Sequence, residues 1–430
     1  MSRGCMATGV AAWLLVFPLS AAAGDLTWDQ AVKQLKDANE DRRAEAVEYI
    51  GDSKEPNALE LIAPLAKDPS PKVRQQVVEE AGWLRTEPGL EIVVSALGDP
   101  EPDVRVEALE AVEYYYVDEL GEKVGQAFMG FLTKEREDPV VVDDPAKIPD
   151  TVLAKVRQAI DDKEDSVQKE AARVLGSLRD ARSIAPLSAL YKNKKTEDSV
   201  REAAVETFGK IGGEECVAIL LEALDDKEED IRAKAATALG WTRSSQAVNK
   251  LLAILKTSKD DEPGPSALFA LAHMPTPETT PVFVEYLKSS EDELRRYAAE
   301  GLGRAANAEH RQMLKTAADG EQDEEARNAM FFALAKLGDS AVIERLAYAL
   351  PKIATRMQVL GYFKELGTEA APHLFPLLQT KDWEVREYAA KALGNMKNPA
   401  AVAPLRELFK DPHAEVADEA RKAVAKLEKR

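Results

Sequence analysis

Apolar residues recur along this chain in a pattern that repeats about every 31 residues. Each repeat is marked by an arginine, with apolar residues one position before it and three and seven positions after it. Steps of four residues place these side chains on one stripe of an α-helix. A period of this size predicts a stack of small repeated units. The arginines are Arg43, Arg74, Arg105, Arg201, Arg232, Arg295, Arg327, Arg356 and Arg386.

A second apolar run with helical spacing follows each of these stretches, for example at residues 90–97. Many units carry a glycine eight residues after the arginine, such as Gly82 and Gly240. We expect the first helix to end there, with the glycine in the left-handed conformation. Three weaker units have another residue at the arginine position: Gln168, Gly264 and Ala417. The pattern therefore predicts an all-α fold, an α-solenoid of about twelve stacked helix-turn-helix repeats.

Three of these units carry a motif that belongs to a known repeat. The motifs are Val-Arg-x-x-Ala-Val-x-x-Phe-Gly-x-Ile at residues 200–211, Ile-Arg-x-x-Ala-Ala-x-x-Leu-Gly at 231–240 and Val-Arg-x-x-Ala-Ala-x-x-Leu-Gly at 385–394. They resemble HEAT-type repeats, and most closely the short HEAT-like variety first described in phycobilisome lyases. The resemblance implies a solenoid over nearly the whole chain after residue 23. It implies no activity, because such repeats serve many unrelated roles.

Aspartates stand six residues before the arginine position of several units. Each one closes a unit, and the arginine opens the next. We therefore expect a ladder of Asp–Arg contacts across the unit junctions, which would satisfy helix-end backbone groups and fix the stacking angle. The alternative is a row of arginines that binds the phosphates or carboxylates of a ligand. The ladder is favoured because the arginines follow the junctions and do not cluster. The aspartates are Asp68, Asp99, Asp162, Asp226 and Asp411.

Acidic residues outnumber basic ones along the chain, 76 against 57, which gives a formal net charge of −19. Many acids lie at the unit junctions, for example at residues 225–230 and 321–325. One interpretation is that these acids form a solvated rim, which favours helix starts and solubility. The alternative interpretation is that they form a surface for a basic partner. We expect no nucleic-acid partner, because a solenoid that wraps a duplex needs a positive groove.

The first 23 residues have the pattern of a secretory signal peptide. Arg3 precedes an apolar run at residues 10–19, and Ala21 and Ala23 provide the small residues of a cleavage site. The run is too short to span a bilayer, and no later stretch is long enough either. The chain after residue 23 holds a single cysteine, Cys216, which we expect to be a buried apolar residue. These features, with the lack of an Asn-x-Ser/Thr sequon, predict an exported protein of the bacterial periplasm or the extracellular space.

The search for catalytic chemistry returns no motif. The four histidines, His273, His310, His373 and His413, fall in different units, and none has a partner at metal-ligand spacing. Deoxyhypusine hydroxylases with HEAT-type repeats use His-Glu dipeptides to hold two irons, and no histidine here is followed by glutamate. Nucleotide-binding and hydrolase motifs are also missing. We expect no cofactor, no metal and no enzymatic activity.

The repeat pattern lapses between Arg105 and Gln168, over 63 residues or about two periods. The lapse contains three consecutive tyrosines and an acidic, proline-containing loop at residues 135–149, which cannot be a continuous helix. It divides the chain into N-terminal repeats at 24–134 and C-terminal repeats at 150–430. The alternatives are a decayed repeat with a surface loop, or a partner-binding loop. Its candidate binding residues are Tyr114, Tyr115, Tyr116, Asp138, Asp143 and Asp144.

Together these features predict an exported, non-enzymatic scaffold that binds a protein or peptide along its curved surface, with a preference for basic partners. We expect the stacked second helices to form the concave face. The alternative is an enzyme, or an accessory subunit of an enzyme complex, with a site near residues 114–149.

Overall fold

In the computed structural model every regular element among the described residues (26–53, 55–117, 139–258 and 263–428) is helical. A short helix, α1 (Trp28–Gln34), precedes twelve first helices, which carry the arginine position of each unit. This number agrees with the predicted number of repeats. The first helices are α2 (Glu40–Asp52), α4 (Pro71–Trp83), α6 (Pro102–Tyr116), α9 (Asp165–Ser177), α11 (Asp198–Ile211), α13 (Glu229–Thr242), α15 (Gly264–His273), α17 (Asp292–Ala305), α19 (Glu324–Lys336), α21 (Ile353–Leu366), α23 (Trp383–Asn395) and α25 (Ala414–Glu428).

Second helices alternate with the first ones. Most of them pack against the first helix of the next unit, and several also pack against that of their own unit. The core lies between these two layers and is filled mainly by alanine, leucine and valine. Several second helices are short and continue as a 3-10 turn. The second helices are α3 (Ala58–Ile62), α5 (Glu87–Ala96), α8 (Asp150–Gln158), α10 (Ile184–Lys192), α12 (Glu214–Ala223), α14 (Val248–Ser258), α16 (Thr280–Tyr286), α18 (Arg311–Gly320), α20 (Ile343–Ala347), α22 (Ala371–Leu374) and α24 (Val402–Glu407).

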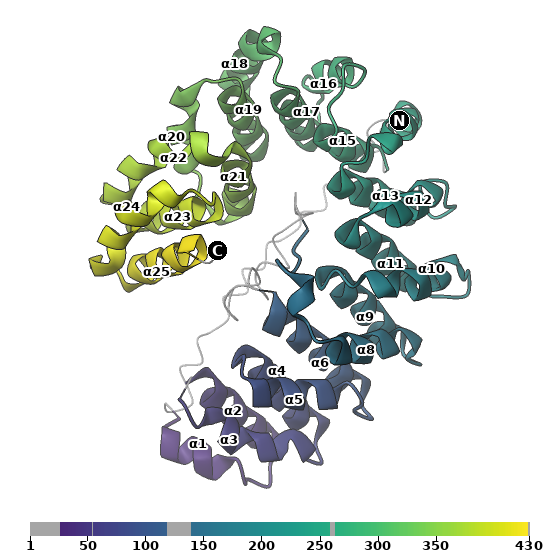
Figure 1. The fold of residues 1–430 in the computed structure, drawn as a ribbon, viewed down its shortest axis with the longest axis vertical. Coiled ribbons are helices and arrows are strands. Elements are labelled where there is room, and N and C mark those ends of the chain that lie inside the picture. Colours follow the sequence, from purple (N-terminus) through teal and green to yellow (C-terminus); the bar gives the residue numbers. More distant parts are fainter. Residues whose placement is uncertain (1–25, 54, 118–138, 259–262, 429–430) are drawn as a thin grey trace, which may run out of the picture.

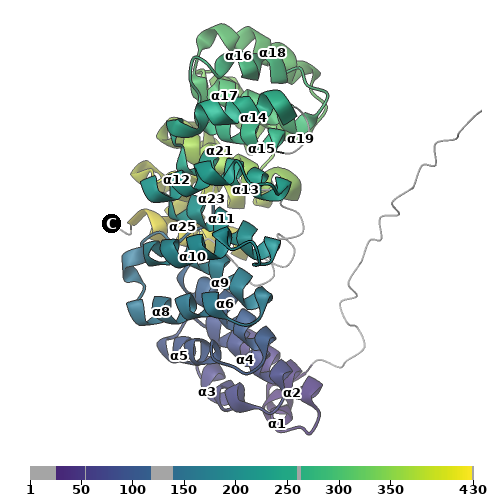
Figure 2. The ribbon, with the colours of Figure 1, turned by 90° about the vertical axis from the view of Figure 1, so that its right-hand side faces the viewer.

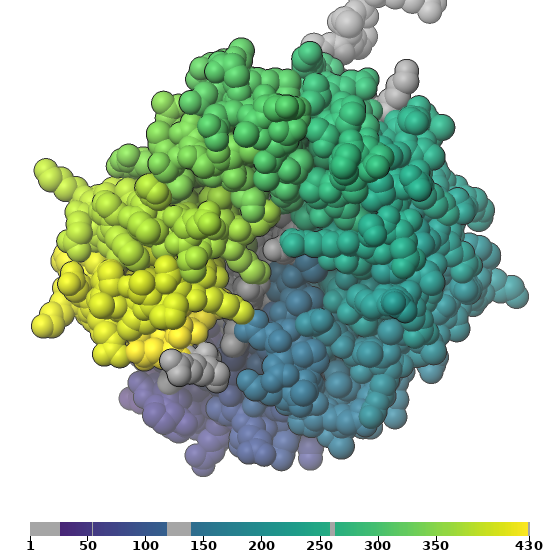
Figure 3. Space-filling view, turned by 45° about the horizontal axis from the view of Figure 1, so that its top comes forward, coloured from purple at the N-terminus to yellow at the C-terminus, as the bar shows by residue number. Residues whose placement is uncertain are grey.

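The stack is strongly curved, with the first helices on the inner side and the second helices on the outer side (Figure 1). The prediction that second helices form the concave face is therefore wrong. Seen from the side, the stack rises from α1 to α16 and α18, and the C-terminal units return from there (Figure 2). In the space-filling view the yellow C-terminal units come round towards the blue units (Figure 3). The inner side is the closely packed one, since each first helix contacts the first helices before and after it.

Glycines eight residues after the arginine position make this close packing possible. A Cβ on Gly209 would lie 2.6 Å from the Cβ of Ala238 in the next first helix, and one on Gly303 would lie 2.6 Å from the Cα of Ala333. Both glycines lie inside their helices, which continue to Ile211 and Ala305. The prediction that they end the helix is wrong, because they are required by a neighbouring backbone and not by a turn.

The left-handed residue that was expected at this glycine lies three positions later. It occurs eleven residues after the arginine position in eight units, and five of these residues are not glycine. The corresponding turn connects the first and second helices of the unit. The left-handed residues are Arg85, Arg179, Gly212, Arg243, Ala306, Gly338, Gly367 and Lys397.

The lapse in the repeat pattern is an insertion within one unit. Helix α6 packs directly on α9, so no first helix lies between them in the stack. Arg105 pairs with Asp162 over 57 residues, whereas the equivalent pair of Arg74 and Asp99 spans 25. The described end of the insertion, residues 139–149, contacts the C-terminal end of α9, where the Val142 N–H donates to the Ser177 carbonyl at 2.7 Å. A decayed repeat, as one alternative supposed, would have placed a further layer between α6 and α9.

No helix among the residues that the structure describes is long and apolar enough to cross a membrane.

Candidate functional site

The repeated arginines join each unit to its neighbours by two kinds of contact. Arg74 shows both. Its Nη1 donates to the carbonyl of Asp68 at 2.9 Å, where the preceding unit ends. Its Nε and Nη2 donate to the two carboxylate oxygens of Asp99, at 2.8 and 2.7 Å, where its own unit ends. A planar guanidinium matches a carboxylate in this way with two parallel hydrogen bonds. One side chain therefore joins the end of the preceding unit to the start and the end of its own unit.

Six of the nine arginines pair with an acid at the end of their own unit. This acid lies six residues before the next arginine position, and we call its place in the repeat the acid position. The carboxylate also accepts a backbone N–H two residues later, for example that of Ser70 at Asp68. Glu321 takes this role for Arg295, although only aspartates were considered from the sequence. The six pairs are Arg43–Asp68, Arg74–Asp99, Arg105–Asp162, Arg201–Asp226, Arg295–Glu321 and Arg386–Asp411.

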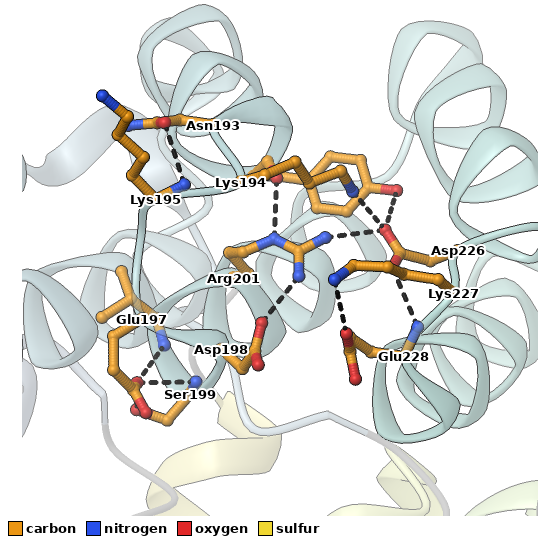
Figure 4. Close-up of polar contacts among 12 residues, drawn as sticks. Asn193, Lys194, Lys195, Glu197, Asp198, Ser199, Arg201, Asp226, Lys227 and Glu228 are labelled. Atoms are coloured by element: carbon orange, nitrogen blue, oxygen red, sulfur yellow. Dashed lines mark hydrogen bonds and ion pairs between the residues drawn. The ribbon is translucent and has the colours of Figure 1, made fainter.

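The Arg201 junction is the most deeply buried of these pairs (Figure 4). The side chains of Arg201 and Asp226 are each 1% exposed, and Nη2 of Arg201 lies 2.7 Å from Oδ2 of Asp226. The same carboxylate accepts from Lys194 at 2.9 Å and from the hydroxyl of Tyr191 at 3.2 Å. Burial alone would raise the pKa of Asp226, but hydrogen bonds from Lys194 and the Glu228 N–H and the charge of Arg201 outweigh it and lower the pKa to about 2.

The remaining three arginines do not hold an acid of the described residues at this position. Arg232 donates to the carbonyls of Asp226 and Lys227, and residues 259–262 of the following junction lie outside the description. Arg356 donates to the carbonyls of Leu350 and Pro351, and its guanidinium lies 3.9 Å from the centre of the Tyr388 ring. Arg327 donates to the carbonyl of Glu321. The acid positions that follow Arg327 and Arg356 hold Leu350 and Thr380.

The inner face of the solenoid is formed by the residues two, five and nine positions after the arginine position, on the side of each first helix that points away from the core. From α4 to α11 this face is half-exposed and mainly acidic. Trp83 and Tyr114 occupy the ninth position in neighbouring units, and their rings stack at a centroid distance of 4.7 Å. The charged residues of this acidic inner face are Glu79, Glu107, Glu110, Glu170, Arg173, Glu206 and Lys210.

Several carboxylates of the acidic inner face converge on one arginine. Nη2 of Arg173 lies 2.6 Å from Glu113 and 2.5 Å from Glu170. Glu110, one turn before Glu113 on α6, accepts a hydrogen bond from the Tyr114 hydroxyl at 3.2 Å. Burial and the nearby charge of Glu170 raise the pKa of Glu110. The acids therefore outnumber the cations here, and a cation brought by a partner would relieve this repulsion.

From α15 to α21 the inner face is closed by buried side chains. Glu300 is 0% exposed; it accepts from the Tyr362 hydroxyl at 2.6 Å and pairs with Arg304 at 3.3 Å. Burial, and then the charge of Arg304, lower the pKa of His273 to about 4, so this buried histidine is neutral at pH 7. The network fills the space that a ligand would need, so the inner face is not accessible from α15 to α21.

The predicted binding residues of the inserted segment do not form one cluster. Tyr114 lies on the acidic inner face, while Tyr115 and Tyr116 contact each other edge to face at 4.9 Å. Asp143 and Asp144 are exposed, and Asp144 accepts the Ala146 N–H that begins a short 3-10 turn. Asp138 lies outside the described residues. A site near residues 114–149 thus stays a prediction, because residues 118–138 are not described.

Groups that could support catalysis are dispersed. In the described part of the chain no three His, Cys, Asp or Glu side chains lie close enough to hold a metal ion. His413 stacks on Trp383 at 5.3 Å, and His310 and His373 lie on other outer elements. Cys216 is buried at the start of α12, and burial raises the pKa of its thiol to about 11, as expected for an apolar core residue.

Comparison with known proteins places the chain in a repeat family. The HEAT-repeat profile matches residues 29–113, 193–272, 265–335, 280–356 and 343–425, and the profile of the PBS lyase HEAT-like repeat matches residues 167–193. Deoxyhypusine hydroxylase-B of rice (Oryza sativa subsp. japonica) is 24% identical over 271 residues, which are 63% of this chain and 80% of the relative.

Solved structures with the same kind of fold are only distantly similar. The complex of CpcE and CpcF of phycocyanin lyase from Nostoc sp. is 17% identical with a TM-score of 0.38, covering 67% of this chain and 100% of that one. The karyopherin Kap121p bound to the C-terminus of the phosphatase Cdc14p is 14% identical with a TM-score of 0.39, covering 93% of this chain and 45% of that one. Since the HEAT-repeat profile accounts for most of its length, this chain belongs to the family of HEAT-repeat proteins.

Proposed function

We propose that this HEAT-repeat protein is an exported, non-enzymatic scaffold that binds a basic segment of a protein partner along the acidic inner face of α4, α6, α9 and α11. The observation that carries the proposal is the accumulation of five partly exposed glutamates along α4, α6, α9 and α11, which outnumber the cations Arg173 and Lys210 on the same face and lie on the side that carries the Trp83–Tyr114 pair. Aromatic side chains provide contact area for a partner, and the acids attract lysine or arginine side chains.

The curvature of the solenoid supports the same assignment. Because four neighbouring first helices present the same three positions, the acids form a row that an extended or helical segment can follow. No single junction has to provide the affinity. The binding is therefore reversible and sensitive to salt, since it depends on charges that remain in contact with water.

Site-specific crosslinking tests this proposal. A photoreactive residue at Gln76, on the acidic inner face, should capture a partner in living cells, while the same residue at Arg182, which is exposed beside a second helix, should not. Mass spectrometry should identify a partner with a basic segment, and the triple variant Glu107→Gln/Glu110→Gln/Glu170→Gln should weaken its capture. The proposal is wrong if both positions capture the same proteins or if the triple variant has no effect.

The proposed export of the protein is tested by N-terminal sequencing and cell fractionation. The pattern of residues 1–23 supports cleavage after Ala23. N-terminal sequencing of the native protein should therefore find Gly24 as its first residue, in the periplasmic or extracellular fraction. A protein that keeps Met1 and stays with the cytosolic fraction would contradict this part of the proposal.

A further inference from the structure

The junction that follows Arg327 lacks the acid that pairs with the arginine at the junctions of the ladder. Its acid position holds Leu350, which is fully buried, and Lys352 stands two residues later. The ion-pair partner of Arg327 is Glu324 on the same helix, whose carboxylate lies 3.7 Å from Nη2 of Arg327. The Arg327 side chain is 32% exposed, whereas those of the six arginines with a junction acid are between 1% and 19% exposed. The Arg327 side chain is therefore more exposed than that of any arginine that holds a junction acid.

Two further cations share the surface with Arg327. An open pocket of about 140 Å³ is lined by Arg327, Arg345, Tyr348 and Lys352, with Glu324 as its single carboxylate. Glu324 is occupied by Lys352, whose Nζ lies 2.5 Å away. Three cations against one acid leave this pocket positive in a chain whose net charge is −19. The positive charge is thus local and lies around α19 and α20, whereas the acidic inner face lies on α4 to α11.

Exposed apolar side chains lie next to these cations. Tyr348, Ile353 and Met357 are 51%, 46% and 37% exposed, and only Tyr49 is a comparably exposed large apolar residue elsewhere in the described chain. Ile353 and Met357 are four residues apart and lie on one face of α21. Apolar residues that gather on a surface and are bordered by charges are typical of a contact site.

We propose that this surface, the 327–357 patch, binds an acidic peptide segment of a partner protein. A carboxylate of the peptide takes the place on Arg327 that the chain's own acids take on Arg295 and Arg386, with two parallel hydrogen bonds. Lys352 and Arg345 attract further acids, and an aliphatic or aromatic side chain of the peptide packs on Tyr348 and Ile353. The inference rests on the proposed scaffold role, but it concerns a different surface and the opposite charge.

Peptide binding to the purified chain tests the proposal. The probe is a fluorescein-labelled peptide, Asp-Leu-Asp-Phe-Asp-Leu, followed by fluorescence anisotropy, with Asn-Leu-Asn-Phe-Asn-Leu as its neutral counterpart. The acidic peptide should bind, and binding should weaken as salt is raised. The neutral peptide should bind at least tenfold more weakly, as roughly expected when hydrogen bonds to charged groups are lost. Equal binding of the two peptides, or displacement of the acidic one by inorganic phosphate in modest excess, would overturn the proposal.

Matched arginine variants locate the binding. Arg327→Gln and Lys352→Gln should each weaken binding of the acidic peptide by about tenfold while the fold stays intact, because neither side chain holds a buried junction acid. Arg295→Gln removes an equivalent arginine that already holds Glu321, so it should lower stability and leave peptide binding unchanged. The opposite result, with Arg295→Gln but not Arg327→Gln affecting the peptide, would refute the assignment. Crosslinking from Gln76 should be unchanged in Arg327→Gln, which keeps this test separate from that of the inner face.

Discussion

The Arg201 and Arg327 junctions place the same residue at the same position of the repeat and use it differently. At the Arg201 junction the carboxylate of Asp226 accepts four donors, and both charged side chains are fully buried. At the Arg327 junction a leucine replaces the acid, and the guanidinium stays one-third exposed. The comparison shows that the arginine motif alone does not define its role. An arginine that is followed by a junction acid fastens two units, and we propose that Arg327, which is followed by a leucine, is open to a partner.

The largest effect is expected from Arg201→Gln. The substitution leaves Asp226 buried with only Lys194, Tyr191 and a backbone N–H, and breaking a buried pair in this way costs about 3 kcal/mol or more in free energy of unfolding. The urea midpoint followed by circular dichroism measures it. Arg182→Gln is the control, because its ion pair with Asp150 is largely exposed and should contribute little to stability. Equal losses in both variants would show that burial does not distinguish the junctions.

The pH dependence of Asp226→Asn should separate the Arg201 junction from the rest of the molecule. Since the pKa of Asp226 is lowered from 3.8 to about 2, the stabilisation is present above pH 3.8 and is lost as pH falls towards 2. The wild type should exceed the variant by about 2 kcal/mol at pH 7, and the difference should vanish near pH 2. Asp225→Asn, at the neighbouring exposed acid, serves as the control. A difference that is constant over this range would argue against the ion pair as its source.

The first helices pack closely both near the Arg201 junction and near the Arg327 junction. Disrupting this packing should therefore lower stability by a similar amount in the two regions. Gly209→Ala and Gly303→Ala each place a Cβ within 2.6 Å of the next first helix, and each should cost about 1–3 kcal/mol in free energy of unfolding. Gly320→Ala meets nothing within 4 Å and should change stability little or raise it slightly. Urea denaturation of the three variants measures these values. Clearly unequal losses at Gly209 and Gly303 would mean that the two regions differ in more than the junction residue.

Sequence periodicity predicted the solenoid and most of the ladder, because arginine and aspartate recur at positions that a helix brings together. It misassigned the glycines, since glycine serves both tight turns and close backbone approach, and only the neighbouring Ala238 or Ala333 shows which applies. It also read the 63 residues after Arg105 as two periods, because an insertion of about one unit's length imitates a decayed repeat. The inner face was not predictable, since which helix lies inside depends on contacts between units far apart in the chain.

The smallest effect is expected at Arg327, where the comparison is most easily broken. Arg327→Gln removes one hydrogen bond to the Glu321 carbonyl and a long contact with Glu324, so the free energy of unfolding should change by at most about 0.5 kcal/mol. Arg295→Gln, which loses two hydrogen bonds to a carboxylate that is 5% exposed, should cost about 1–2 kcal/mol. The urea midpoints of the two variants give the difference in their free energies of unfolding, provided that both unfold with the same dependence on urea concentration. If both lose the same stability, Arg327 is engaged within the chain as firmly as Arg295, and its guanidinium is not available to a partner.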